Sequence, residues 1–265
     1  MKTILVTGAA SGIGRAAAAY FAERGYTVLA LDILEMPPED GIRPFRADVT
    51  SEAELSAVRD TLLSEGITLD VILSVAGLHR MASFVEGDFE VIRRLLDVNL
   101  LGVMQTNRVF HSLLAPGGRV VIVTSEVATY DPLPFNGLYT VSKCALESYA
   151  QALRQELALL GQKVVTVRPG AVETPLSGGT LSAAEQLEQR TVLFRREAAH
   201  FTRLTARFMG VPIKPERLAP TIFRAATARR PRLSYAKHRH VGLILLSCLP
   251  KRLQCAIVRL LLHRK

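Results

Sequence analysis

The amino-acid sequence predicts a single α/β domain with a doubly wound parallel sheet of about seven strands, flanked by helices and followed by a C-terminal helical extension. Three observations predict this class. Short β-branched runs alternate with helical patterns, no Ser- or Pro-rich linker interrupts the alternation, and a glycine-rich turn follows the first strand. A chain of 265 residues can form one such domain or two small ones, and the unbroken alternation favours one.

The first expected strand covers residues 2–7, and we expect no signal or transit segment before it. The turn T-G-A-A-S-G-I-G at 7–14 follows, and an alanine-rich helical pattern then runs from Arg15 to Gly25. Glycines in a strand–turn–helix unit permit a tight turn, a close approach to a pyrophosphate and close helix packing, and the helix amino terminus supplies N–H groups. An ordinary glycine-rich connection is the alternative. The predicted pyrophosphate contacts are Gly8, Ser11, Gly12, Ile13 and Gly14.

The second expected strand, 27–31, ends at Asp32, which lies 24 residues after Gly8 (32 − 8). A carboxylate at this place accepts hydrogen bonds from the adenosine ribose and repels a 2′-phosphate. Asp32 therefore favours NAD over NADP. Arg15 offers an alternative phosphate partner, so NADP stays open.

Residues near 48 begin the next helix, with Thr50 or Ser51 as its N-cap. The strand 70–75 follows, and the loop 77–86 after it lies at the carboxyl edge of the sheet, where doubly wound folds bind ligands. His79 in this loop has two interpretations, a substrate contact or a solvated loop histidine, and we favour the second.

A long helical pattern covers residues 88–114 and is expected to bend near Gly102. Asn99 lies inside this pattern, although asparagine lowers helix propensity. Such a residue indicates either a site or merely the bend.

A second motif lies between the β-branched run 120–123 and a long helical pattern. Ser125 follows the strand, and Tyr139 and Lys143 share one helix face because they are four residues apart. A nearby ammonium favours the phenolate, so a tyrosine paired in this way can exchange a proton with an alcohol or carbonyl oxygen. The apolar loop 127–138 covers this pair, and it indicates either a lipophilic substrate or packing against itself or a partner subunit.

The strand 163–168 precedes an insertion at 171–210, which starts with a Ser/Gly turn at 177–180 and continues as helices. An insertion at this place is expected to cover the site as a lid. A helix at 215–231 and a final strand at 232–235 complete the domain, which we place at residues 1–235.

Residues 236–265 form a basic amphipathic extension, in which the apolar run 241–249 is too short to span a bilayer. Its second segment carries leucines along one side and Lys and Arg elsewhere. This pattern suits an anionic membrane surface, and the alternative is an appendage that covers the substrate pocket or a dimer interface. The two interpretations are compatible.

The net charge of +9 arises in this C-terminal part, because 12 Lys and Arg and no acids follow Glu216, whereas residues 1–216 carry 21 basic and 24 acidic side chains. No base-reading feature accompanies the charge, so we expect no nucleic-acid binding. Three cysteines and six histidines show no ligand spacing, and we expect no metal.

Taken together, the glycine-rich turn and the Y-x-x-x-K pair with its upstream serine resemble the short-chain dehydrogenase/reductase family over residues 2–235. The resemblance implies a Rossmann-type fold, an NAD(P)-dependent oxidoreductase acting on CH–OH groups, and a homodimer or homotetramer. The implied catalytic residues are Asn99, Ser125, Tyr139 and Lys143. The implied cofactor contacts beyond the turn are Asp32, Asp48, Val49, Ala76, Gly77, Asn99, Tyr139, Lys143, Pro169, Gly170, Val172 and Thr174.

By the same resemblance, Tyr139 exchanges the substrate proton, Ser125 binds the substrate oxygen, Lys143 lowers the pKa of Tyr139 and holds the nicotinamide ribose, and Asn99 positions Lys143 through a water. The extension resembles the hydroxysteroid- and retinoid-oxidising branch. We therefore expect a lipophilic secondary alcohol or ketone as substrate, and a cytoplasmic protein with peripheral membrane contact as one option. A reductase of a polar or acyl-linked ketone and a catalytically silent nucleotide sensor are the alternatives.

Two departures from the family pattern stand out. Residues 74–77 read S-V-A-G where the family has N-N-A-G, and the missing amides bear on local backbone order rather than on the chemistry. Ser125 lies 14 residues before Tyr139 (139 − 125), one more than expected, which leaves Thr124 as a less favoured stand-in.

Overall fold

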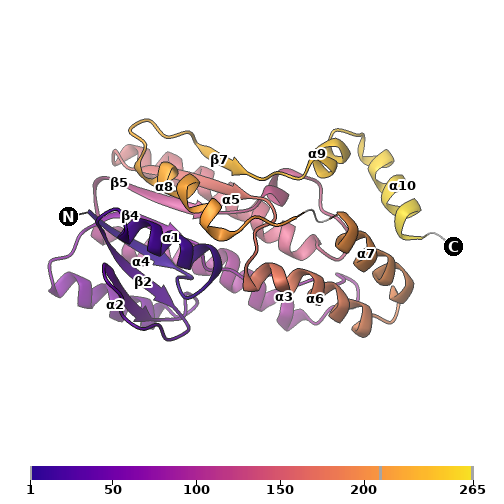
Figure 1. The fold of residues 1–265 in the computed structure, drawn as a ribbon, viewed down its shortest axis with the longest axis horizontal. Helices are drawn as coiled ribbons and strands as arrows, with labels where there is room; N and C mark the ends of the chain where they lie inside the picture. Colours follow the sequence, from indigo (N-terminus) through magenta and orange to yellow (C-terminus); the bar gives the residue numbers. More distant parts are fainter. Residues whose placement is uncertain (1, 209–210, 264–265) are drawn as a thin grey trace.

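A computed structural model describes residues 2–208 and 211–263 of the chain, without the side chains of 175–182 and 208. The outermost residues 1 and 264–265 and the end of the expected lid, 209–210, lie outside the described residues. Seven strands form one parallel sheet in the order β3-β2-β1-β4-β5-β6-β7, which confirms the predicted doubly wound class (Figure 1). The strands are β1 (Lys2–Thr7), β2 (Tyr26–Asp32), β3 (Ile42–Arg46), β4 (Leu69–Ser74), β5 (Leu114–Val123), β6 (Lys163–Pro169) and β7 (Ser234–Lys237).

The sheet is buried on both faces, which explains why its strands read as continuous apolar runs. Neighbouring residues of β1 show this, because Leu5 belongs to one hydrophobic cluster and Ile4 to the other. One face is covered by α2 (Glu52–Ser64), α4 (Gly102–Phe110) and α5 (Gly137–Leu159), and the opposite face by α1 (Gly12–Ala22) and α8 (Ala219–Thr227).

The edge strands are the least regular part of the sheet. β3 was not located from the sequence, because Pro44 interrupts a half-exposed strand and proline is tolerated only at a sheet edge. At the other edge, β7 lies two residues later than expected. α8 ends at Thr227, and Ala228 after it has an extended backbone. Pro231 disfavours helical backbone at Arg230, the residue before the proline.

The helix predicted for 88–114 is divided into α3 (Phe89–Leu96), a π-helical turn η1 (Asp97–Leu101) and α4. The π-turn places Asn99 toward the protein interior, where it is fully buried. Gly102 follows it, and a Cβ atom there would lie 2.8 Å from Cγ2 of Val49, so only glycine lets the helix approach this valine. The predicted bend is therefore confirmed, as a π-turn that ends at Gly102.

A second, helical lobe lies at the carboxyl ends of the strands (Figure 1). It contains α6 (Pro175–Arg190), α7 (Arg195–Phe208), α9 (Val241–Ser247) and α10 (Lys251–Leu262). The lobe has a hydrophobic cluster of its own, built from Phe135, Leu187, Ala198, Phe201 and Leu262. The prediction of a turn at 177–180 is wrong, because these residues lie within α6, which begins at Pro175.

Candidate active site

Two adjoining cavities open at the carboxyl ends of the strands, one of about 510 Å³ and one of about 230 Å³. Ile13, Gly77 and Thr174 border both of them. The predicted residues at the smaller cavity are Gly8, Ser11, Gly12, Ile13, Gly14, Asp32, Asp48, Val49, Ala76, Gly77 and Thr174. Those at the larger cavity include Ser125, Tyr139, Lys143, Pro169, Gly170 and Val172. The fold thus brings together residues from positions 8 to 174.

The glycine-rich turn forms one wall of the smaller cavity with backbone alone. Gly8 has a left-handed φ of +69°, and a Cβ atom there would lie 2.8 Å from the backbone of Ala76. Gly12 also has a positive φ, of 51°, and a Cβ atom on Gly14 would lie 2.0 Å from the carbonyl oxygen of Gly8. Three glycines are therefore required for this close approach of turn, helix and β4, and the bare helix terminus suits a pyrophosphate.

Asp32 lies at the end of β2 and borders the smaller cavity. Its carboxylate accepts hydrogen bonds from the backbone N–H of Ala10 (2.9 Å) and of Leu34 (3.0 Å). Arg15, the alternative phosphate partner, forms an ion pair with Glu39. A fixed negative charge therefore stands at the far end of the cavity.

Asp48 and Arg94 close the same end of the cavity. Oδ1 of Asp48 accepts from the backbone N–H of Thr50 (2.9 Å), and Oδ2 lies 3.0 Å from Nη2 of Arg94. Burial would raise the pKa of Asp48, but these hydrogen bonds from Thr50 and Arg94 hold its pKa below the ordinary value. Ser51, not Thr50, caps α2 by accepting from the N–H of Glu54.

The hydroxyl of Thr7 holds the backbone that the asparagine side chains missing at 74–75 would otherwise hold. Its hydroxyl oxygen accepts hydrogen bonds from the N–H groups of Val75 (3.1 Å) and Ala76 (3.2 Å). Ser74 itself lies within 3.5 Å of the Asn107 side chain. The S-V-A-G segment is therefore tied to β1 and α4 by side chains that sequence reasoning did not single out.

Ser125 and Tyr139 meet at the inner end of the larger cavity. The hydroxyl of Ser125 is hydrogen-bonded to the Tyr139 phenol and also accepts from the N–H of Val127 (3.3 Å). Burial raises the pKa of Tyr139 to about 12, although the bond with Ser125 lowers it. Thr124, the stand-in, instead donates to the Glu147 carboxylate (2.6 Å), so Ser125 is the hydroxyl beside the phenol.

Lys143 lies one helical turn after Tyr139 and is buried. Its Nζ donates to the carbonyl oxygen of Val123 (3.3 Å) and lies 5.7 Å from the centre of the Tyr139 ring. Burial lowers the pKa of Lys143 to about 8. The expected lowering of the Tyr139 pKa is therefore not found in the protein alone, because burial disfavours both charged forms.

Asn99 acts as a clamp on the loop after β4. Its Oδ1 accepts from the N–H of Leu78 (2.6 Å), and its Nδ2 donates to the carbonyl of Leu78 (2.8 Å) and to Ser142 (3.1 Å). A Cβ atom on Gly77 would lie 3.3 Å from Oδ1 of Asn99 and 3.7 Å from Nζ of Lys143. Asn99 and Lys143 therefore both lie close to Gly77, although Asn99 itself lines neither cavity.

The sequence profile described as short chain dehydrogenase matches residues 2–185, about two thirds of the chain. The chain belongs to the short-chain dehydrogenase family. Members of this family are oxidoreductases that act on CH–OH groups with a nicotinamide cofactor.

Two curated relatives illustrate the range of this family. The NADPH-dependent 1-acyldihydroxyacetone phosphate reductase of Schizosaccharomyces pombe is 33% identical over 194 residues, which cover 69% of this chain and 65% of that protein. The 1-hydroxy-2-glutathionyl-2-methyl-3-butene dehydrogenase of Rhodococcus sp. is 30% identical over 187 residues, covering 67% and 80% respectively. The chain thus spans just under two thirds of the first relative and more of the second.

Solved structures agree with the fold. A short-chain dehydrogenase family protein from Francisella tularensis superposes with a TM-score of 0.74 at 22% identity, covering 89% of this chain and 96% of that one. The ligand-free aldohexose dehydrogenase of Thermoplasma acidophilum gives 0.72 at 23% identity, covering 89% and 91%. At these identities the likeness establishes the fold alone.

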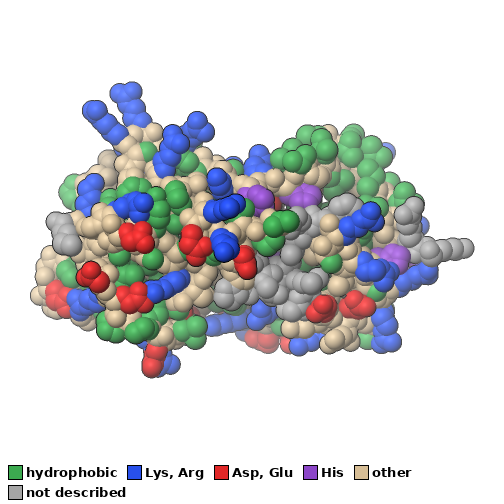
Figure 2. All heavy atoms as spheres, viewed as in Figure 1, with side chains coloured by type: hydrophobic (Ala, Val, Ile, Leu, Met, Phe, Trp, Pro, Cys, Tyr) green, Lys and Arg blue, Asp and Glu red, His purple; other side chains and the backbone are tan. Residues whose placement is uncertain are grey.

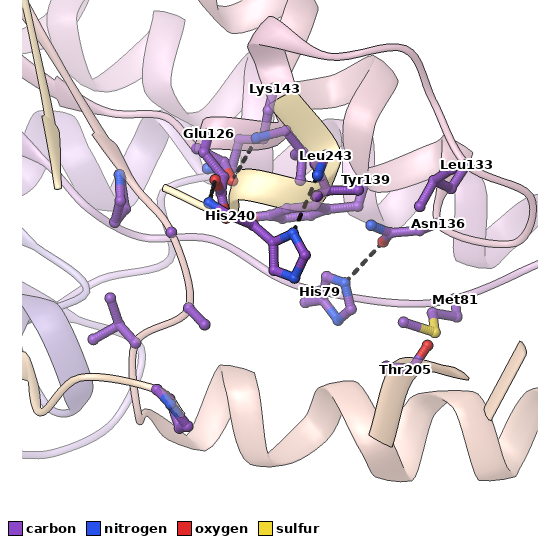
Figure 3. Close-up of a pocket in the computed structure, with 18 of the residues that line it drawn as sticks. His79, Met81, Glu126, Leu133, Asn136, Tyr139, Lys143, Thr205, His240 and Leu243 are labelled. Atoms are coloured by element: carbon purple, nitrogen blue, oxygen red, sulfur yellow. Dashed lines mark hydrogen bonds between the residues drawn. The ribbon is translucent and has the colours of Figure 1, made fainter. Parts of the chain in front are cut away.

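The structure contradicts the interpretation of His79 that the sequence favoured. It is 6% exposed and packs edge-on against the Tyr139 ring, with ring centres 4.6 Å apart, while its Nε2 lies 3.0 Å from Oδ1 of Asn136 (Figure 3). Burial lowers the pKa of His79, and the charges of Arg80 and Lys143 act in the same direction. The prediction that His79 is a solvated loop histidine is therefore wrong. His79 is a buried part of the wall of the larger cavity, and the edge position of its loop was the available signal.

The rest of the larger cavity is predominantly apolar, and three segments supply its wall. The loop after Ser125 contributes Val127, Leu133 and Pro134, α7 contributes Phe201 and Leu204, and α9–α10 contribute Leu243, Leu246, Ile257, Val258 and Leu261. Phe135 of the same loop packs on Phe194 and Phe201, with ring centres 5.7 and 5.5 Å apart. The loop therefore both lines the cavity and packs on the helical lobe, and the extension covers the pocket.

In the described part of the chain, no three His, Cys, Asp or Glu side chains gather as a metal site. Tyr139, Ser125 and Lys143 are groups at this site that can take part in acid–base chemistry. A phenol, a hydroxyl and a buried ammonium at the inner end of an apolar cavity can bind an alcohol or ketone oxygen and exchange one proton with it.

Proposed function

We propose that the chain is an NAD(H)-dependent dehydrogenase/reductase that interconverts a secondary alcohol and a ketone on a lipophilic molecule of hydroxysteroid or retinoid type. The observation that carries this proposal is the apolar cavity of about 510 Å³ whose inner end holds Ser125 and Tyr139. A pocket lined by hydrophobic side chains with few polar groups suits a largely apolar ligand. Residues 171–210, which include α6 and α7, serve as its lid.

In the proposed oxidation, Tyr139 as phenolate would accept the O–H proton of the alcohol, whose C–O bond becomes a carbonyl. A nicotinamide, when bound, would supply the acceptor for the C–H hydride. Ser125 would donate a hydrogen bond to the substrate oxygen and stabilise the charge that develops on it. Lys143 would hold the nicotinamide ribose and, in its charged form, favour the phenolate, and Asn99 would position Lys143 through a water.

NAD is the proposed cofactor, and Asp32 supports it, because a fixed carboxylate at the end of β2 repels a 2′-phosphate. The ion pair of Arg15 with Glu39 supports the same preference, since it occupies the basic side chain nearest the turn. The relative from S. pombe is named as NADPH-dependent, so NADP is the alternative that a direct comparison decides.

One rival function follows from the same relative, whose name indicates an acyl-linked ketone substrate. Under this rival, the cavity holds the acyl chain and the reacting ketone carries a polar group. A catalytically silent nucleotide sensor is the second rival, and the convergence of Ser125, Tyr139 and Lys143 at one cavity argues against it.

The test is NADH formation from hydroxysteroids, retinol and short aliphatic secondary alcohols, with NAD and then NADP. We expect turnover of a lipophilic alcohol with NAD, and loss of turnover in Tyr139→Phe with cofactor binding retained. Faster reduction of acyl-linked ketones than of any lipophilic ketone would support the reductase instead. Cofactor binding without turnover of any substrate would support the sensor.

The proposal includes an anionic membrane surface as a partner. Val241, Leu245, Leu253 and Leu260 are between 47% and 68% exposed, and Figure 2 shows hydrophobic side chains gathered at this end of the molecule. Basic side chains flank them on α10, and no acidic residue follows Glu216. Among the described residues, no helix has the length and apolarity needed to cross a bilayer. A cytoplasmic location with peripheral contact stays a prediction.

Cosedimentation with vesicles tests this partner. We expect binding to vesicles that contain phosphatidylserine, weaker binding at high salt, and loss of binding in the double variant Leu253→Ser, Leu260→Ser. Vesicles of phosphatidylcholine alone are the control. Equal binding by wild type and the double variant would contradict the proposal, and a salt-independent dimer in place of vesicle binding would assign this surface to a second copy of the chain.

A further inference from the structure

The carboxylate of Glu126 lies directly after Ser125 and is 7% exposed. Its Oε2 accepts a hydrogen bond from the backbone N–H of His240 (2.6 Å) and another from the Tyr130 phenol (3.2 Å). The first bond joins positions 114 residues apart and links the turn beside the catalytic serine to the start of the C-terminal extension (Figure 3).

Two further contacts attach the extension to the same turn. Arg239 donates through Nε to the Tyr130 oxygen (3.0 Å) and through Nη2 to the hydroxyl of Thr129 (3.3 Å). Lys251, the first residue of α10, forms an ion pair with Asp131. The bond to Thr129 and the ion pair of Lys251 are exposed, whereas Glu126 is buried and binds the backbone of the extension directly, so Glu126 contributes more to the attachment than these two contacts do.

Where the chain leaves β7, its backbone lies in close contact with the residue that follows β6. Gly170 donates its N–H to the carbonyl of Lys237 (2.9 Å), and a Cβ atom on Gly170 would lie 1.7 Å from the carbonyl oxygen of His238. His238 itself has a left-handed φ of 61°, a conformation that non-glycine residues rarely adopt. The backbone at 238–240 therefore has a defined, strained path that needs fixing at its end.

His240 is the N-cap of α9, and its Nδ1 accepts from the N–H of Leu243 (3.1 Å). Glu126 therefore holds the residue from which α9 starts. Leu243 and Leu246 of this helix line the larger cavity, and α10 after it adds Ile257 and Val258. A shift of His240 moves this apolar wall relative to Ser125 and Tyr139.

We infer that Glu126 is a positioning residue for substrate selection. Its carboxylate holds the start of α9, and α9 and α10 then keep the apolar wall at the distance from the reacting oxygen that a long lipophilic alcohol requires. A short alcohol occupies only the inner end beside Ser125 and does not use this wall. The inference rests on the proposed function, because it concerns the lipophilic substrate of that site.

The test compares a long lipophilic alcohol with a short secondary alcohol in Glu126→Ala and Glu126→Gln. We expect the ratio of kcat/KM for the long alcohol to that for the short one to fall about tenfold in Glu126→Ala, through KM, because a buried N–H loses its acceptor. Glutamine keeps an acceptor oxygen at this place, so Glu126→Gln should restore the ratio to within about threefold. Glu156→Ala, at an exposed glutamate near the end of α5 that lines neither cavity, is the matched control.

Tryptic cleavage after Arg239 or Lys251 gives a readout that needs no turnover. We expect faster cleavage in Glu126→Ala than in wild type and Glu126→Gln, with cofactor affinity retained as the test of folding. An equal loss for both alcohols with unchanged cleavage would overturn the inference and place Glu126 with Ser125. If wild type oxidises no lipophilic alcohol, the proposed function fails, while the cleavage rates still decide whether Glu126 holds the extension.

Discussion

Lys143 is buried and Tyr139 is partly buried beside the cavity, and burial shifts the two pKa values in opposite directions. The pKa of Tyr139 rises to about 12 and that of Lys143 falls to about 8, so the protein alone favours a neutral phenol and weakens the ammonium. In the protein alone, Lys143 therefore does not make the phenolate the favoured form of Tyr139.

The first prediction concerns the pH dependence of oxidation. In the proposed oxidation the phenolate of Tyr139 accepts the proton, and because the pKa of Tyr139 lies at about 12, most of the tyrosine is protonated below that pH. We expect kcat/KM for alcohol oxidation to rise with pH between 7 and 10, by up to about tenfold per unit. Initial rates across this range check it. A flat profile would assign the proton transfer to another group.

The second prediction concerns the stability of the cofactor-free protein. The pKa of Lys143 is about 8 when folded and 10.5 as the ordinary value, so the unfolded chain binds more protons between these pH values and wild-type stability rises with pH there. Below pH 8 the burial of this charge costs about 3 kcal/mol. We expect Lys143→Met to be more stable than wild type at pH 7, with a much smaller gain at pH 10.

Urea unfolding at the two pH values measures this difference. Lys214→Met replaces an exposed lysine and is the control, for which we expect less than about 0.5 kcal/mol at either pH. A gain for Lys143→Met that is equal at pH 7 and pH 10 would mean that packing of the methionine, rather than removal of the charge, is responsible.

At the scale of elements, the connection between β6, β7 and α9 decides where the helical lobe lies. It depends on the close approach of Gly170 to His238, which a Cβ atom would prevent at 1.7 Å. The parallel pairing of β6 with β7 fixes the other side of this connection. Neither element can move alone without breaking backbone contacts.

The third prediction follows from that contact. Gly170→Ala should lower the free energy of unfolding by about 3 kcal/mol, because the backbone at His238 must move away from β6. Gly66→Ala is the matched control, since a Cβ atom there meets no atom within 4 Å but its φ is +68°, and we expect a loss of only about 1 kcal/mol. Equal losses for the two variants would show that the steric contact is not limiting.

At the scale of the whole molecule, members of the family are usually oligomeric. The helices that carry Asn99 and Tyr139 expose apolar side chains, with Leu101 53% and Val141 45% exposed. A homodimer or homotetramer that buries these helix faces is the proposed assembly. In this proposed assembly the lobe formed by α9 and α10 would lie outside the interface, which is compatible with the proposed membrane contact.

The fourth prediction is that Leu101→Glu shifts the mass in solution toward the monomer. A charge in the centre of an apolar helix face opposes its burial in an interface. Light scattering after size exclusion measures the mass, and Leu63→Glu, at a residue 48% exposed near the end of α2, is the control. An unchanged mass for Leu101→Glu would place the interface elsewhere.

The sequence predicted the sheet and the inner site well, because both depend on local patterns. The glycine-rich turn, the β-branched strands and the Tyr139–Lys143 spacing can each be recognised from residues that are close in sequence. Asp32 and Ser125 can be placed because each lies at the end of a predicted strand. β3 was missed because Pro44 and half-exposed side chains hide its alternation. Glu126 and His79 were missed or misjudged because their partners, His240 and Tyr139, are distant in sequence and no spacing rule connects them.

The larger cavity receives side chains from Ile13 to Leu262, whereas the smaller one needs none after Thr174. This difference sets an order in which the two sites form during synthesis, since domains generally fold from the amino terminus as the chain emerges. A chain halted after β7 would already contain every residue that lines the smaller cavity, and fluorescence of added NADH on such a truncated protein would test whether a nucleotide binds there. The apolar wall that α9 and α10 contribute to the larger cavity would form only when the last two helices have been made.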